Sequence, residues 1–209
     1  MGLFDRFKKA KMPTEKGLAD AGDATQKLLD TDIRDIWDIC NRNMFIIAMN
    51  GWLSKKCNYG ENIATLTAEE KTVYIVLSFE AEANNGGFEQ YLFNSSGGAF
   101  AGELVASLSA IGANRTADIY KKALENFTCE LPADDELRSK LLDELLTDEI
   151  SKIFASCDRQ FYEYLDNLEM LVYQFIINKK VVLNEQKGGS IVEMFPPLLC
   201  LLLLRWPTY

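Results

Sequence analysis

The chain contains no histidine among its 209 residues. Histidine is the commonest general base in enzymes and the commonest metal ligand, and its charge changes near neutral pH. Catalytic systems built on Ser-His-Asp or Cys-His pairs are therefore excluded. The five cysteines are scattered without a Cys-x-x-Cys spacing, which indicates reduced thiols in a cytoplasmic protein rather than a disulfide framework. We therefore expect no metal site and no cofactor.

Basic residues are few, with 22 Lys and Arg against 31 Asp and Glu and a net charge of −9. Phosphate binding depends on clustered Lys and Arg, so direct contact with nucleic acid or with anionic membranes is disfavoured. A basic protein partner, including a DNA-binding protein, suits this charge, although negative charge also serves solubility alone. No apolar run is long enough to span a bilayer, so we expect no stable membrane insertion.

Two terminal segments differ from the rest of the chain. Residues 1–30 begin with a basic amphipathic stretch that lacks the apolar run of a signal peptide, and 12–30 are expected to be a linker or a weakly ordered lead-in. Residues 181–209 contain the apolar run 198–204, which we expect to pack on the core or on a dimer partner. The helical core domain is therefore expected over 31–180.

Apolar residues in this core domain recur at helical spacing, and nothing alternates strands with helices. The predicted fold class is therefore all-α, a single irregular multi-helix bundle. One amphipathic helix is expected from about Thr31 to Asn50-Gly51, and residues 51–66 are expected to be irregular. The capping box Thr67–Glu70 opens a second helix, which runs to about Asn84. Further helices are predicted near 88–92, 104–111, 119–127, 134–146 (with Leu137, Leu141, Leu142 and Leu145 facing inward) and 161–178.

A double-glycine break follows the second helix. At least one of Gly86 and Gly87 is expected to have a positive φ, because the chain must turn sharply there. The side chains of Gln90 and Asn94 are expected to be at least partly buried and hydrogen-bonded around residues 84–85, replacing backbone bonds that the turn cannot make. Glu80 lies in the apolar stripe just before this break. It is either a site carboxylate or a structural hydrogen-bond acceptor for a neighbouring helix.

The order of these elements resembles the bacterial DNA-mimic protein family, a domain family of largely unknown function, over roughly residues 33–178. We call residues 82–97 the signature segment. The positions that carry the resemblance are Glu82, Asn85, Gly86, Gly87, Phe88, Gln90, Tyr91, Phe93, Asn94, Gly97, Ile111 and Gly112. Residues 158–162 also fit a helix opening of this family. The resemblance implies an all-helical, dimeric protein whose acidic surface imitates duplex phosphates and occupies the DNA site of a transcription factor.

Carboxylates are concentrated between Cys129 and Glu149. This stretch contains eight of them and only two cations, Arg138 and Lys140. We define seven of them as the acidic face, and we expect them to be exposed, unpaired and partner-binding: Asp134, Asp135, Glu136, Asp143, Glu144, Asp148 and Glu149. On helices they would project a ridge of negative charge comparable to phosphates. Acidic residues early in a helix also complement its dipole, which is a structural explanation for some of them.

Three functional hypotheses follow. The first is a non-enzymatic interaction protein whose acidic face binds a basic partner, in the manner of a DNA mimic. The second is a structural or immunity-type binding module whose partner is set by shape and apolar contacts. The third is a carboxylate-based enzyme, with Glu80 and Glu82 beside Asn85 and Gln90 in a small cleft.

Overall fold

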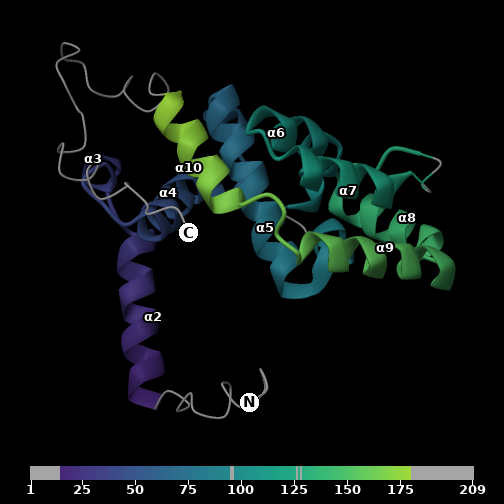
Figure 1. Ribbon diagram of the computed structural model, residues 1–209, viewed down its shortest axis with the longest axis horizontal. Helices are drawn as coiled ribbons and strands as arrows, with labels where there is room; N and C mark the ends of the chain where they lie inside the picture. Colours follow the sequence, from purple (N-terminus) through teal and green to yellow (C-terminus); the bar gives the residue numbers. More distant parts are fainter. Residues whose placement is uncertain (1–14, 95–96, 126, 128, 180–209) are drawn as a thin grey trace, which may run out of the picture.

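The computed structural model describes residues 15–94, 97–125, 127 and 129–179. Within these ranges the chain forms helices and no strand, which confirms an all-α, irregular bundle (Figure 1). The α-helices are α2 (Glu15–Leu29), α3 (Ile33–Ile36), α4 (Arg42–Lys56), α5 (Ala68–Phe93), α6 (Leu104–Ala110), α7 (Asn114–Leu124), α8 (Asp135–Leu145), α9 (Asp148–Phe161) and α10 (Leu168–Asn178). Short 3-10 helices lie at Asn58–Gly60, Ile63–Thr65 and Gly98–Glu103. No described helix has both the length and the apolar character needed to cross a membrane.

Helix α5 is the centre of the bundle and contacts α4, α6, α8, α9 and α10. Its start confirms the capping box: Thr67 Oγ1 accepts a hydrogen bond from the Glu70 amide, and Glu70 Oε2 accepts one from the Thr67 amide. The buried Glu70 carboxylate also pairs with Lys56 Nζ of α4 at 2.6 Å. A local sequence signal therefore also ties two helices together.

The core is built around the Phe79 ring, which is fully buried on α5. Four rings lie at 5.2–5.8 Å from it, at tilted or edge-on angles, and they belong to Phe88, Tyr91, Tyr120 and Phe161. Such aromatic pairs stabilise a fold by about 0.5–1.5 kcal/mol each beyond their buried area. Because the rings come from both halves of α5 and from α7 and α9, this cluster sets how the bundle closes.

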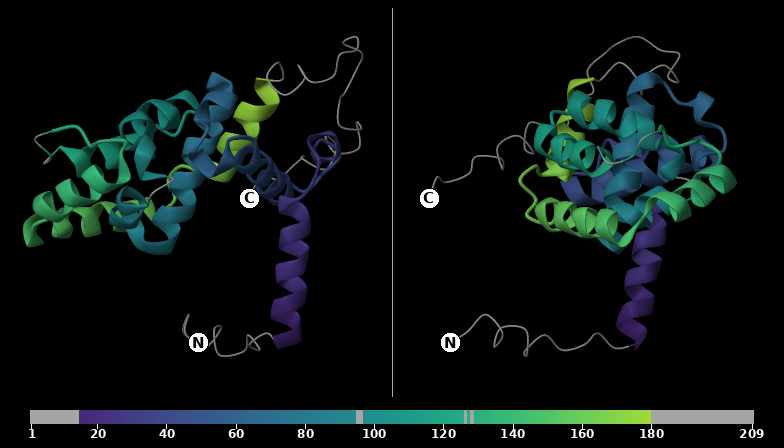
Figure 2. Two further views of the ribbon diagram at one scale, coloured as in Figure 1. Left: turned by 180° about the vertical axis from the view of Figure 1, so that it is seen from behind. Right: turned by 90° about the vertical axis from the view of Figure 1, so that its right-hand side faces the viewer.

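The N-terminal part of the chain differs from the prediction. Glu15–Leu29 forms helix α2, which projects away from the bundle and contacts α4 at its C-terminal end (Figure 2). The predicted helix stop at Asn50-Gly51 is wrong, because α4 continues through it to Lys56. A Cβ on Gly51 would lie 2.7 Å from the Leu29 Cα, so this glycine allows α2 to approach α4 closely.

The helix predicted over 161–178 is confirmed only from Leu168 to Asn178, where α10 lies. Helix α9 ends at Phe161, and α10 begins at Leu168. Tyr164 between them has φ +48°, and Leu165 is 63% exposed rather than buried. Residues 158–162 form the last turn and C-cap of α9 rather than a helix opening. The prediction of a helix ending at Gly112 is confirmed by α6 and by the φ of +87° at that glycine.

Several expectations lie outside the described residues. They concern the amphipathic segment at 1–14 and the packing of the apolar run 198–204. The division into a core domain at 31–180 and a C-terminal tail remains a prediction.

Candidate functional site

The signature segment contains a sharp break inside α5. Gly86 (φ −161°) and Gly87 (φ +80°) both have non-helical backbone angles, which confirms the predicted turn. A Cβ at Gly87 would collide with the Asp158 carboxylate of α9, so the position is restricted both by its conformation and by its neighbour. The prediction of positive φ was correct, but the packing against Asp158 has no signal in the sequence.

Asp158 acts as a cap for the second half of α5. Its Oδ1 accepts a hydrogen bond from the Phe88 amide at 2.9 Å, where the helix restarts after the break. Burial raises the pKa of this carboxyl, while the hydrogen bond from Phe88 opposes the rise. Nearby, the Tyr162 hydroxyl donates to the Ala83 carbonyl at 2.8 Å and the Tyr164 hydroxyl donates to Asn84 Oδ1 at 2.7 Å. The end of α9 therefore holds both sides of the break.

The polar residues of the signature segment behave differently from the prediction. Gln90 is exposed, and its Nε2 donates to Glu82 Oε2 at 3.2 Å, across the break rather than to residues 84–85. Asn94 is partly buried as expected, but its Oδ1 accepts from the Gly97 amide at 2.8 Å and so orders the next turn. Asn85 and Phe93 are exposed. The signature residues thus mostly shape the backbone around the buried rings of Phe88 and Tyr91.

Arg138 joins the end of α5 to the start of α8, and its side chain is fully buried. Its Nε donates to the Leu92 carbonyl at 2.9 Å, and its Nη2 donates to the Asn94 carbonyl at 3.0 Å. Its Nη1 donates to the carbonyls of Pro132 and Ala133, and Nη2 also pairs with Asp135. The terminal carbonyls of a helix lack partners within the helix, and a cation there also suits the helix dipole. In the sequence, nothing distinguishes Arg138 from an ordinary cation near the acidic residues.

The acidic face lies at the N-cap of α8, along α8 and in the first turn of α9. All seven carboxylates are exposed. Two of them have structural roles: Asp134 caps α8 by accepting from the Leu137 amide at 2.9 Å, and Asp135 pairs with Arg138 at 2.9 Å, so the expectation of no pairing is wrong for Asp135. The other five form no ion pair or hydrogen bond with any described residue: Glu136, Asp143, Glu144, Asp148 and Glu149.

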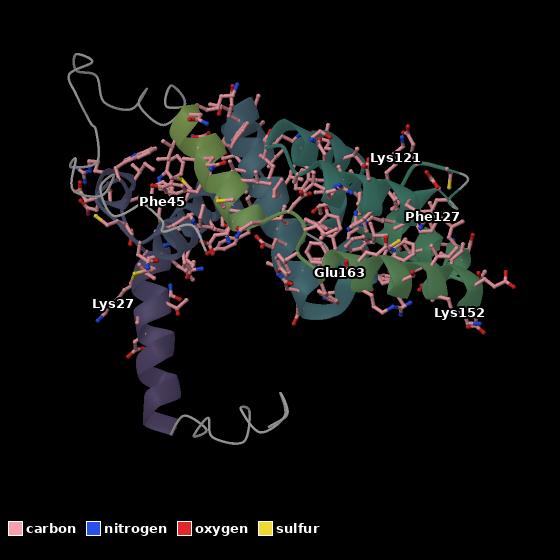
Figure 3. All side chains as sticks on the ribbon, in the orientation of Figure 1. Lys27, Phe45, Lys121, Phe127, Lys152 and Glu163 are labelled. Carbon is pink, nitrogen blue, oxygen red and sulfur yellow. The ribbon has the colours of Figure 1, made fainter. Side chains whose placement is uncertain are left out.

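Two lysines near this face form no ion pair with its carboxylates. Lys140 lies four residues from both Glu136 and Glu144 on α8, yet it forms no ion pair with either of them. Lys152 lies on α9 at the same end of the molecule and projects outward from it (Figure 3). The first-turn acids Asp148 and Glu149 follow the α9 N-cap Thr147, where they complement the helix dipole. Five carboxylates of the acidic face therefore have no partner among the described residues.

Leu137 was expected to face inward, and it is instead 60% exposed beside these carboxylates. The inward positions of this part of α8 are occupied by Arg138 and Leu142, both fully buried. Leu141 and Leu145 are partly buried. The apolar spacing alone favoured four inward leucines, because an arginine is rarely fully buried unless it is well paired.

Glu80 lies on α5 before the Gly86–Gly87 break, and Glu169 of α10 is close enough to affect it. It accepts no hydrogen bond from a described residue, so the interpretation as a structural acceptor is wrong. Burial raises the pKa of this carboxyl to about 7, and the Glu169 carboxylate adds to the rise. Glu169 is itself held by Arg42 Nε at 2.6 Å and by Asn43 Nδ2. Glu80 is therefore a lone, mostly buried carboxyl group.

These positions do not assemble the carboxylate cleft of the enzyme hypothesis. Glu82 is hydrogen-bonded to Gln90 at the surface, and Asn85 is exposed. The charged group that shifts the pKa of Glu80 is the Glu169 carboxylate of α10. The described ranges also hold no cluster of three or more acidic or cysteine side chains arranged for a metal ion.

Comparison with known proteins identifies a family. A model of the DMP19-like protein family matches residues 64–179, which is more than half of the chain. The match begins just before the capping box and ends at the last residue of the described bundle, so it starts later than the predicted resemblance from residue 33. No curated protein and no solved structure matches the chain.

Proposed function

Because the chain belongs to the DMP19-like (DNA mimic protein 19) family, we propose that it is a non-enzymatic protein whose acidic face occupies the DNA-binding surface of a basic partner, such as a transcription regulator. The observation that carries this proposal is the set of five exposed, unpaired carboxylates on α8 and α9. Duplex DNA presents rows of phosphate charge, and a protein that reads DNA supplies Lys and Arg to meet them. Carboxylates without internal partners can meet the same cations.

The unpaired state of these carboxylates is the important feature. A carboxylate already paired within the chain would have to give up that partner before it could bind a cation elsewhere. Free carboxylates grouped on one side also produce a field that attracts a basic protein over distances of about 10 Å at moderate salt. Asp134 and Asp135 contribute to this field, but their first role is to hold the start of α8.

The test is capture of a partner by the immobilised protein from an extract of its source organism, at low and at high salt. The test variant replaces the five free carboxylates by amides: Glu136→Gln, Asp143→Asn, Glu144→Gln, Asp148→Asn and Glu149→Gln. It should keep the helical fold, because none of these side chains is buried. We expect it to lose the salt-sensitive partner, and we expect DNA to compete with that partner for the wild type.

A matched control variant changes the net charge equally at exposed positions outside the acidic face: Asp35→Asn, Asp38→Asn, Asp118→Asn, Glu125→Gln and Glu163→Gln. This control should retain the partner if position matters, and should lose it if only total charge matters. A partner that both variants retain at high salt would instead favour the structural or immunity-type module, in which shape and apolar contacts set recognition.

A further inference from the structure

Helix α10 is apolar on nearly all of its sides. Eight of its 11 residues are apolar or aromatic, but only Leu168, Val172 and Ile176 of these are buried. The other five are partly buried or, in the case of Met170, 37% exposed. A helix of this kind is normally covered on every side. The main contacts of α10 are with α4 and α5, toward one end of the bundle, and part of its apolar surface remains accessible to solvent (Figure 1).

A partly open hollow, which we call the α10 groove, continues this surface near the C-terminal end of α10. Its apolar lining comes from three helices: Met49 and Leu53 of α4, Val73 of α5, and Phe175 and Ile176 of α10. Four of these side chains are buried, whereas Phe175 is only half-buried. The groove and the accessible side of α10 together form an apolar surface suited to a further apolar segment.

The charge beside the groove matches one segment of the chain. Glu69 lines the groove next to Glu70, and unlike Glu70 it forms no ion pair with any described residue. The run 198–204 contains six leucines and one cysteine, and Arg205 follows it directly. An apolar run followed by a cation therefore complements an apolar groove bordered by a free carboxylate.

The run is also tethered beside the groove. Lys179 lines the groove, and the 18 residues 180–197 join it to the run. Eighteen residues can span up to about 60 Å, several times the length of α10 at about 1.5 Å per residue. A tether of this size holds the run at an effective concentration on the order of millimolar, which favours packing within one copy over packing by a second copy.

We propose that the α10 groove is the docking site of the chain's own C-terminal segment, with the apolar run 198–204 packed against Phe175 and over the hollow, and with Arg205 toward Glu69. Both apolar surfaces are then removed from water within one copy of the chain, which is the favourable term in their association.

The experiment places the photo-crosslinker p-benzoylphenylalanine at position 175 of the full chain, where it replaces a phenylalanine and keeps the aromatic ring. After irradiation, denaturing gels separate crosslinks within one copy from crosslinks between copies, and peptide mass spectrometry locates them. We expect a crosslink within one copy to residues 198–204. The same group in place of Leu137, an exposed residue of α8, should give no crosslink to this run.

Substitutions in the run test its apolar character. Leu201→Asp together with Leu202→Asp should lower the yield of the crosslink from position 175 by at least about tenfold, because carboxylates are strongly disfavoured against an apolar surface. The matched control, Asn184→Asp with Ser190→Asp, adds two carboxylates in the connecting residues and should crosslink like the wild type. Circular dichroism checks that each variant keeps the helical bundle.

A crosslink that joins two copies would assign the groove to a second copy and overturn the proposal. The absence of any crosslink to the run, or an undiminished yield from the variant with two aspartates in the run, would overturn it as well. The acidic face takes no part in this packing, because α8 and α10 lie toward opposite ends of the bundle (Figure 1). Each of these outcomes therefore leaves the capture test of the proposed function unaffected.

Discussion

The signature segment and the acidic face use polar residues in opposite ways. In the signature segment the polar groups bind within the chain: the Phe88 amide to Asp158, Gln90 to Glu82, and Asn94 to the Gly97 amide. On the acidic face, five carboxylates have no partner among the described residues. The part of the sequence that carries the family resemblance therefore builds the fold, whereas the acidic face, which we propose as the binding surface, keeps carboxylates that the fold does not use.

Arg138 is the residue on which the two regions meet. It binds carbonyls at the end of α5 and also holds the start of α8, which carries part of the acidic face. The comparison therefore predicts that changes in the buried network cost stability, whereas changes in the acidic face cost binding alone.

The largest effect is expected for Arg138→Met. This change removes the Arg138 donors from the carbonyls of Leu92 and Asn94, of which the second keeps only the Gly98 amide, and we expect it to lower the free energy of unfolding by about 3–5 kcal/mol. Urea denaturation measures the loss. Lys140→Met, an exposed position on the same helix, is the control and should change stability by less than about 0.5 kcal/mol. Equal effects of the two changes would refute the role assigned to Arg138.

A smaller loss, about 2–3 kcal/mol, is expected for Gly87→Val, because the positive φ strains any side chain and the Cβ meets Asp158. Thermal melting should show it. Gly102→Ala is a suitable control, since an added Cβ there meets nothing within 4 Å. If the collision with Asp158 contributes, Gly87→Ala should cost less in an Asp158→Ala background than alone. Strict additivity would leave backbone strain as the whole cause.

Glu80 predicts a pH dependence. Its folded pKa of about 7 lies above the ordinary value of 4.5, so the folded state binds the extra proton between these values. Stability should therefore fall as pH rises from about 5 to 7 and then level off. Glu80→Gln should remove this fall and raise stability at pH 8 by about 1–2 kcal/mol, allowing for partial exposure. The two proteins should be nearly equal at pH 5, and an identical pH profile would contradict the assignment.

The smallest effect on stability is expected for the five-carboxylate amide variant of the acidic face. Its side chains are exposed and unpaired, so the free energy of unfolding should change by less than about 1 kcal/mol in total. The loss of favourable dipole contacts at Asp148 and Glu149 is offset by reduced repulsion. A loss as large as that of Gly87→Val would show that the acidic face is structural, and the contrast between the two regions would fail.

The sequence by itself determined the local features. The missing histidines excluded whole classes of catalysis, helical spacing predicted the all-α class, and the Thr67–Glu70 capping box and the turn at Gly87 both formed as expected. These signals act through hydrogen bonds and backbone angles within about four residues, so nearby letters are enough to predict them.

Tertiary structure alone decided which residues meet. Asn50-Gly51 carries a helix-stop signal, yet α4 continues to Lys56, and Gly51 packs against the backbone of α2. Asp158 caps Phe88 from 70 positions away, and Arg138 rather than Leu137 occupies the interior side of α8. Burial depends on which surfaces are brought together, and an arginine can replace a leucine in the core when several carbonyls receive its donors.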